Sequence, residues 1–266
     1  MRAEQKVGTI IRSLIRRIEN RQISAIARAV SILENGYSHR SANQTLKAKI
    51  LKYLNVSDFR KSHGFLVGVT GPAGSGKSTL IAALAKLVRR EKKKVAVIAV
   101  DPTSPRTGGA FLGDRVRMQE LADDPGVFIR SMASRGAQGG IARATKDAAK
   151  LFIKAGYDFV LIETVGAGQL DYEVTKFADL TLLVLTPESG DEIQFMKAGL
   201  REVVDVFVIN KADRPGANAL EDFLRRAQGN AKAKVPIFKT IAEEKKWIEP
   251  LYQFILESKL SKNNAE

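Results

Sequence analysis

A glycine-rich octapeptide at residues 71–78 restricts the fold of this chain more than any other feature. It reads Gly-Pro-Ala-Gly-Ser-Gly-Lys-Ser, follows a short apolar run at 65–69 and precedes a strongly helical pattern. A strand, a loop of the form G-x-x-x-x-G-K-[ST] and a helix in this order build a phosphate cradle, because the backbone N–H groups and the helix N-terminus face the anion. The octapeptide therefore predicts a triphosphate-binding loop.

The residue types in this loop suggest individual roles. Lys77 is expected to reach the β- and γ-phosphates, and the hydroxyl of Ser78 is expected to ligate Mg²⁺. A chance glycine-rich turn would not need the strand and the helix on either side. The predicted phosphate-binding residues are Gly71, Pro72, Ala73, Gly74, Ser75, Gly76, Lys77, Ser78 and Thr79.

A second motif, Asn-Lys-Ala-Asp at residues 210–213, follows an apolar run at 203–209. Ligands of open α/β sheets bind at such strand ends. The Asp213 carboxylate can accept both N1–H and N2–H₂ of guanine, whereas adenine would leave it unpaired, and sites built on polar pairing reject the wrong partner strongly. Lys211 is expected to lie along the base, and Asn210 to tie the loop together. The two motifs together predict binding of GTP and GDP.

Short apolar runs alternate with helical stretches from residue 65 onward. This alternation is typical of an α/β fold with a mostly parallel sheet flanked by helices on both faces. We expect a helical N-terminal extension at 1–60, a P-loop nucleotide-binding domain at 61–260 with a closing helix at 246–260, and a tail at 261–266. The expected strands are 65–69, 95–100, 127–130, 158–163, 180–186, 203–209 and 235–238.

Composition limits the partners and the compartment. The net charge is +14, and residues 1–63 hold 13 Lys and Arg against 4 Asp and Glu. A basic segment can touch nucleic acid, but here the charges interleave with an apolar helical stripe (Ile10, Ile11, Leu14, Ile15, Ile18), which favours the solvated faces of packed helices. An acidic protein partner or CoA-type phosphates are the other interpretations. Without a long apolar run or a signal-peptide pattern, we expect a cytoplasmic protein that binds neither membrane nor nucleic acid.

Three loops at strand ends are candidates for nucleotide-sensing segments. Asp101 opens the loop 101–114 and either holds Mg²⁺ or its water, or begins a turn. Glu163 either binds a metal-bound water or is an exposed acid in a turn, and the Gly166 N–H is placed to sense the γ-phosphate. Gln169 either positions the attacking water or is a structural amide. The segment 186–192 is either a third such loop or a connection to a helix at 192–200.

These motifs, taken in order, resemble the MeaB/ArgK/MMAA-type GTPases. The resemblance covers residues 15–258. It rests on the combination of several motifs in this order, because no single motif is specific to the family. Besides the two nucleotide motifs it includes Val-Ser-Ile-Leu-Glu-Asn-Gly at 30–36, Ala-Val-Asp-Pro-Thr-Ser-Pro at 99–105, Leu-Gly-Asp-Arg-Val-Arg-Met at 112–118, Arg-Ser-Met-Ala-Ser-Arg-Gly at 130–136 and Glu-Thr-Val-Gly-Ala-Gly-Gln at 163–169.

The resemblance implies a GTP-hydrolysing chaperone of an adenosylcobalamin-dependent acyl-CoA mutase, usually methylmalonyl-CoA mutase. Such a protein gates cofactor loading and protects the mutase. Residues 101–118 then match a first switch, 163–173 a second, and 186–197 a third that relays the nucleotide state to the mutase. The intrinsic hydrolysis is expected to be slow and Mg²⁺-dependent, with the partner completing the site.

The chain also departs from the family pattern. The third switch usually reads Pro-Gly-x-Gly-Asp, whereas residues 187–191 read Pro-Glu-Ser-Gly-Asp. The usual Ser-Ala of the guanine-supporting loop is replaced by Thr240-Ile241-Ala242, in which the Ala242 N–H is expected to serve. Family members often continue as a helical arm that dimerises, and we expect this arm to be absent from a chain that stops at Glu266, with a homodimer left as an open alternative.

Three other functions were weighed against the chaperone. The basic N-terminal segment suggests a GTPase that acts on RNA or the ribosome, which salt-sensitive RNA binding would reveal. A metallochaperone GTPase requires Cys or His ligands, and the chain has no cysteine and only two histidines, His39 and His63. A small-molecule kinase requires an acceptor pocket, for which no segment remains.

Overall fold

The structure of the protein is a computed structural model that describes most of the chain. The described ranges are 2–35, 41–56, 64–101, 119–133, 140–164, 169–189, 204–229 and 234–265.

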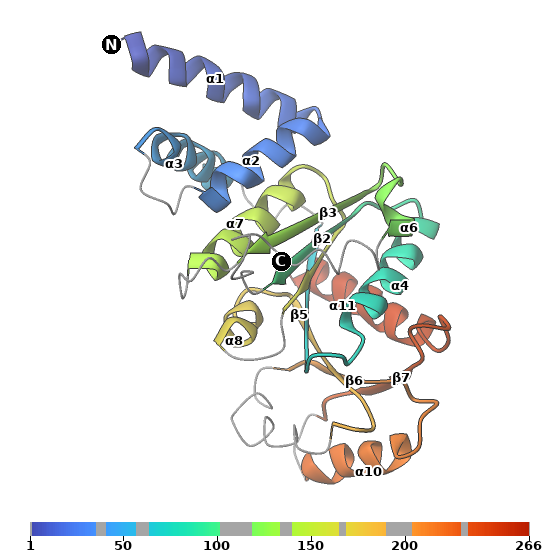
Figure 1. Ribbon diagram of the computed structural model, residues 1–266. Coiled ribbons are helices and arrows are strands. Elements are labelled where there is room, and N and C mark those ends of the chain that lie inside the picture. The colour runs from blue at the N-terminus through green and yellow to red at the C-terminus, as the bar shows by residue number, and fades with distance from the viewer. Residues whose placement is uncertain are drawn as a thin grey trace.

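A seven-stranded sheet forms the centre of the molecule (Figure 1), and every strand pairing in it is parallel. The spatial order is β3-β2-β4-β1-β5-β6-β7. Strands β1, β4, β5 and β6 are buried along their whole length, as a parallel sheet covered on both faces requires. The strands are β1 (Phe65–Thr70), β2 (Val95–Asp101), β3 (Val127–Ala133), β4 (Phe159–Glu163), β5 (Leu180–Leu185), β6 (Val206–Asn210) and β7 (Ile237–Thr240). All seven predicted strands are confirmed, with shifts of a few residues at their ends.

Helices cover both faces of the sheet because alternate residues of each strand project to opposite sides. One face packs against α4 (Lys77–Arg90), α6 (Gln119–Ala122) and α11 (Glu249–Ala265), in a cluster that includes Val67, Val97 and Val184. The opposite face packs against α7 (Gly140–Lys154) and α8 (Gln169–Thr175) over β1 to β4, and against α10 (Ala217–Ala227) over β5 and β6.

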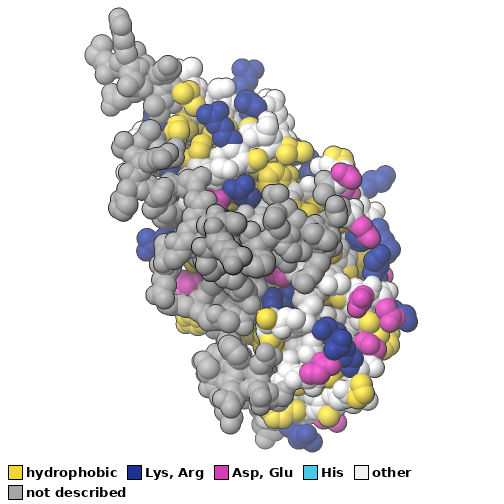
Figure 2. All heavy atoms as spheres, in the orientation of Figure 1, with side chains coloured by type: hydrophobic (Ala, Val, Ile, Leu, Met, Phe, Trp, Pro, Cys, Tyr) yellow, Lys and Arg dark blue, Asp and Glu magenta, His cyan; other side chains and the backbone are white. Residues whose placement is uncertain are grey.

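Three N-terminal helices extend the second face: α1 (Arg2–Glu19), α2 (Ile23–Asn35) and α3 (Ser41–Val56). Helix α2 lies against α7, and its Ile26, Val30 and Leu33 side chains are almost completely buried. These side chains belong to the same apolar cluster as Phe152 of α7 and Ile162 of β4. Lys and Arg side chains lie over this part of the molecule on the face that Figure 2 shows.

The closing helix differs from its predicted bounds. Helix α11 begins at Glu249 instead of 246 and continues to Ala265, so that residues 261–265 are helical. Contacts outside the apolar stripe stabilise the last turns: the Lys259 ammonium lies 4.3 Å from the centre of the Phe159 ring, and Lys262 pairs with Asp179. No described helix combines the length and the apolar character that a membrane crossing requires. The helix expected at 192–200 lies outside the described residues.

Candidate functional site

The carboxyl ends of the central strands bring the sequence motifs to one edge of the sheet. Parallel register pairs Val69 of β1 with Glu163 of β4, and Thr70 with Leu183 of β5. The glycine-rich loop follows β1, which lies between β4 and β5 in the sheet. Strands β2 to β4 lie on one side of β1 and strands β5 to β7 lie on the other, so the strand order changes direction at β1. Open α/β sheets bind ligands at such a point.

The glycine-rich loop adopts a conformation that only glycine accommodates without strain. Gly71, Gly74 and Gly76 have φ angles of 138°, 79° and 88°. A Cβ atom on Gly71 would lie 2.1 Å from the Val184 carbonyl oxygen, so that β5 packs directly against the loop backbone. Gly76 is the residue immediately before α4, and therefore the loop ends at a helix N-terminus, as the octapeptide predicts.

Lys77 is held inside this loop. Its side chain is buried, and Nζ donates hydrogen bonds to the carbonyl oxygens of Gly71 and Pro72 at 2.7 and 2.8 Å. Ser75, in the same loop, is 1% exposed, and its Oγ has no hydrogen-bond partner within the part of the chain that the structure describes. The loop thus carries a cation and a buried hydroxyl group next to its backbone.

Ser78 and Glu163 meet at the start of α4 and the end of β4. The Ser78 hydroxyl donates a hydrogen bond to Glu163 Oε1 at 2.6 Å, and both residues are buried. A hydroxyl and a carboxylate are the oxygen ligands that Mg²⁺ prefers, and Mg²⁺ completes its shell with water and phosphate oxygens. The chemistry of this pair therefore fits the ion that the sequence predicts there.

Asn210 connects three segments of the site. Its Nδ2 donates to the Ser75 carbonyl oxygen at 2.8 Å, while Oδ1 accepts hydrogen bonds from Thr240 Oγ1 and the Ala242 N–H, both at 3.1 Å. The residue is 2% exposed. Sequence reasoning assigned the Ala242 N–H to guanine and did not find the roles of the Thr240 hydroxyl or the Ser75 carbonyl, since neither has a local pattern.

A cavity of about 420 Å³ lies beside the glycine-rich loop and the 211–214 loop. Lys211 crosses between the two, because its Nζ donates to the Gly74 carbonyl oxygen at 2.8 Å. Asp213, on the same loop, is exposed to solvent. The lining residues are Pro72, Ala73, Gly74, Ser75, Thr186, Glu188, Ser189, Lys211 and Arg214. The predicted phosphate and base motifs thus meet around one hollow of ligand size.

Comparison with known proteins places the chain in a family. A family profile described as "Methylmalonyl Co-A mutase-associated GTPase MeaB" matches residues 26–265. The chain belongs to the MeaB family of GTPases. It is 44% identical to a GTPase of Pyrococcus horikoshii over 256 residues, which are 94% of this chain and 78% of that protein. It is 38% identical to "Methylmalonic aciduria type A homolog, mitochondrial" of Mus musculus over 196 residues, 72% of this chain and 47% of that protein.

A solved structure supports the fold of this MeaB-family GTPase. The crystal structure of an LAO/AO transport system kinase matches with a TM-score of 0.76 and 28% sequence identity, over 97% of this chain and 77% of that one. The resemblance inferred from the motifs and the predicted P-loop fold are both confirmed.

The structure describes only some of the remaining residues that the sequence predicts for the site of this MeaB-family protein. Asp101 is the last residue of β2 and pairs with Ala133 of β3, at the same sheet edge as Glu163. Gln169 is the first residue of α8. The side chains of Asp101 and Gln169, the whole of Gly166, and the switch segments 102–118 and 190–197 lie outside the described residues, so the roles assigned to them stay predictions.

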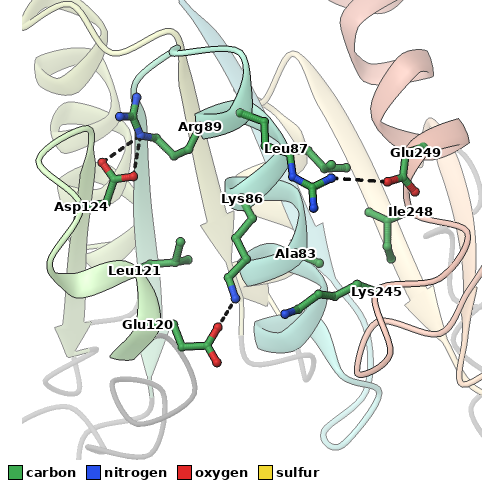
Figure 3. A pocket seen from close by; sticks show the side chains of 11 residues that line it. Ala83, Lys86, Leu87, Arg89, Glu120, Leu121, Asp124, Lys245, Ile248 and Glu249 are labelled. Atoms are coloured by element: carbon green, nitrogen blue, oxygen red, sulfur yellow. Dashed lines mark hydrogen bonds and ion pairs between the residues drawn. The ribbon is translucent and has the colours of Figure 1, made fainter.

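A second cavity, of about 410 Å³, lies over the C-terminal half of α4 in this MeaB-family protein (Figure 3). Six of its seven charged side chains form pairs: Lys86 with Glu120, Arg89 with Asp124, and Arg90 with Glu249. The hydrogen bond from Arg89 lowers the pKa of Asp124. Because these pairs satisfy each other, we do not place the nucleotide there. Among the described residues, no three His, Cys, Asp or Glu side chains gather closely enough to hold a metal.

Proposed function

We propose that this MeaB-family GTPase binds GTP and GDP at the sheet edge described above and uses the nucleotide state to chaperone an adenosylcobalamin-dependent acyl-CoA mutase. The observation that carries the nucleotide site is the Asn210 network, since one buried amide connects the glycine-rich loop to both segments expected around the base. The mutase is suggested by the family description and by the name of the mouse relative.

The triphosphate would lie along the glycine-rich loop. Backbone N–H groups of residues 71–79 and the N-terminus of α4 would bind its oxygens, and Lys77 would exchange a loop carbonyl for the β- and γ-phosphates. A buried ammonium placed there in advance stabilises the charge that develops as the γ-phosphate bond breaks. Gln169 is proposed to orient the attacking water, and Gly166 to sense the γ-phosphate.

Ser78 and Glu163, together with Asp101, would hold Mg²⁺ at this site. The bound ion would neutralise charge on the phosphate oxygens. The Ser78 hydroxyl donates to Glu163, so the chain's own residues orient both proposed ligands toward each other. Loss of the γ-phosphate is expected to release the loops that follow Asp101 and Glu163.

Guanine would be read by Asp213 through N1–H and N2–H₂, with Lys211 along the base. The Ala242 N–H, which donates to Asn210 Oδ1, would be shared with the guanine carbonyl oxygen in a bifurcated hydrogen bond. Asn210 would then set the distance between the phosphate and base contacts rather than touch the base.

Nucleotide titration of the purified protein tests the first half of this proposal. We expect GDP and GTP to bind in the presence of Mg²⁺ with at least a hundredfold preference over ADP and ATP, since Asp213 has no adenine partner. GTP turnover should be slow. ATP turnover as fast as that of GTP would contradict the site.

Reconstitution with an adenosylcobalamin-dependent acyl-CoA mutase tests the second half. Complex formation and transfer of the cofactor to the mutase should differ between GDP and a non-hydrolysable GTP analogue. The Lys77→Ala variant, in which the phosphate contacts are weakened, should lose that difference. Equal binding and loading in both nucleotide states would contradict the chaperone, and salt-sensitive RNA binding instead would favour the RNA-directed alternative.

A further inference from the structure

Two hydrogen bonds close the turn that follows β5. The Ser189 N–H donates to the Thr186 carbonyl oxygen at 2.9 Å, and Ser189 Oγ accepts the Thr186 N–H at 3.0 Å. Thr186 and Ser189 are buried. Pro187 and Glu188 are therefore the two central residues of a β-turn, where the fixed φ of proline is favoured. Glu188 is thus held at a defined position in this turn.

Glu188 pairs with Arg214 of the guanine-recognition loop. Arg214 donates to Glu188 Oε1 at 2.9 Å, and both residues line the 420 Å³ cavity. The backbones approach at the same place, because a Cβ atom on Gly216 would lie 3.6 Å from Pro187 Cβ. The hydrogen bond from Arg214 lowers the pKa of Glu188, with smaller contributions from its own backbone N–H and from Thr186. The ion pair thus joins the β5 turn to the 211–216 loop.

Arg214 has other carboxylates within electrostatic reach. Its pKa is raised first by Glu188, and further by Asp213 and Glu243. Asp213 is the carboxylate that is proposed to read guanine, and it directly precedes Arg214. A guanidinium group presents parallel N–H donors that match both oxygens of a carboxylate. The N1–H and N2–H₂ edge of guanine presents the same arrangement, so Arg214 and guanine can offer Asp213 the same pair of parallel donors.

We propose that Glu188 is a positioning residue for guanine binding, which holds the Arg214 guanidinium at the β5 turn and thereby keeps Asp213 available to the base. The inference rests on the proposed nucleotide site. Without the Glu188 carboxylate, Arg214 would turn to Asp213 and compete with guanine. The affinity for nucleotide would then fall in proportion to the fraction of molecules in which Asp213 is occupied.

Four variants and a GDP titration test this assignment. Glu188→Gln should raise the Kd for GDP about two- to fivefold, the range expected from one exposed ion pair. Arg214→Gln removes the competitor along with the pair, so it should raise the Kd for GDP less than Glu188→Gln does. The double variant should match Arg214→Gln to within about 1.5-fold, because without the arginine the loss of the Glu188 carboxylate releases no competitor. Glu221→Gln, which removes a carboxylate paired with Arg225 and Lys239 outside the cavity, is the matched control and should change nothing.

The Kd for GDP in the double variant distinguishes two roles of Glu188: positioning Arg214 and supporting the loop. If Glu188 acted only by bracing the turn, Arg214→Gln would weaken GDP binding as much as Glu188→Gln, and the double variant would not recover. Either result, or an unchanged Kd in Glu188→Gln, would overturn the proposal. Failure of the unsubstituted protein to bind GDP would instead contradict the nucleotide site itself.

Discussion

At the scale of single residues, the site depends on side chains that connect backbone segments as well as on those that would touch a ligand. Asn210 bonds the Ser75 carbonyl, the Thr240 hydroxyl and the Ala242 N–H, and so connects the segments predicted to bind phosphate and base. Gly76 must lack a side chain for this reason, because a Cβ there would lie 2.3 Å from Asn210 Nδ2. Positions of this kind set the spacing between phosphate and base contacts.

Replacing Asn210 by alanine should therefore affect both stability and binding. The change leaves buried donors and acceptors without partners, which costs on the order of 1–3 kcal/mol each when water does not replace the bond. We expect the free energy of unfolding to fall by about 2 kcal/mol and the Kd for GDP to rise more than tenfold, measured by urea denaturation and nucleotide titration. Asn218→Ala, at an exposed hydrogen bond to Lys239, is the control, and an equal loss there would contradict the network's role.

Replacing Asp213 by asparagine should change the base that is preferred. The amide offers one acceptor and one donor group, so it mismatches the two donors of guanine but suits xanthine, which has a carbonyl at position 2. We expect GDP affinity to fall at least a hundredfold and the affinity for xanthosine diphosphate to rise. Competition binding measures both, with Asp222→Asn on exposed α10 as the control. A retained preference for GDP would remove Asp213 from the base site.

At the scale of elements, α3 carries a buried charge where the helices pack. Lys47 is only 7% exposed, and burial lowers its pKa from 10.5 to about 8. Asp147 opposes this shift and Arg143 adds to it. A lysine in this position weakens the folded state at neutral pH, because the charged form is better solvated in the unfolded chain.

The stability of the protein should consequently rise between pH 8 and 10. In this window the unfolded state keeps the Lys47 proton while the folded state releases it, so the free energy of unfolding increases with pH. Above pH 10 the trend should reverse, because the pKa values of Tyr53 and Tyr157 are raised from 10.0 to about 12 by burial and unfolded tyrosines ionise first. Denaturation curves at several pH values measure the free energy of unfolding. The Lys47→Met variant should show a smaller rise between pH 8 and 10, whereas Lys52→Met, at an exposed position, should leave the rise unchanged. An unchanged slope in Lys47→Met would contradict the assignment.

At the scale of the whole molecule, the N-terminal helices share a core with the nucleotide-binding unit. The apolar cluster that includes Ile18, Val30 and Leu33 also includes Phe152 of α7 and strand residues such as Ile98 and Ile162. The division of the chain at residue 60, which sequence composition suggests, stays a prediction. A continuous core favours one cooperative unit over two independent ones.

The Leu33→Ala variant tests this cooperativity. Removing a completely buried leucine side chain costs on the order of 2–5 kcal/mol. We expect helix content, followed by circular dichroism, and bound fluorescent GDP, followed by its emission, to be lost at the same reduced urea concentration. Ile23→Ala, at a side chain that is 51% exposed, should change stability by less than about 1 kcal/mol. Helices that melt before the nucleotide is released would instead indicate two units.

Local patterns in the sequence determined much of this protein. The strand, loop and helix around residues 71–78, all seven strands and the α/β architecture follow from apolar runs and glycine spacing, because each pattern is complete within a dozen residues. The ends of helices were less predictable from the sequence. Helix α11 continues past its predicted end at residue 260 because contacts such as the Lys262–Asp179 pair stabilise its last turns.

Only the tertiary structure decided how the motifs combine. Ser78 meets Glu163 across 85 residues of chain, Asn210 meets Ser75 across 135, and Arg214 meets Glu188 across 26. No local pattern encodes these contacts, because they arise from the strand order β4-β1-β5-β6, in which neighbours in space are distant in sequence. The sequence by itself therefore predicts a GTPase with its two nucleotide motifs, whereas the order of strands in the sheet decides which side chains hold those motifs together.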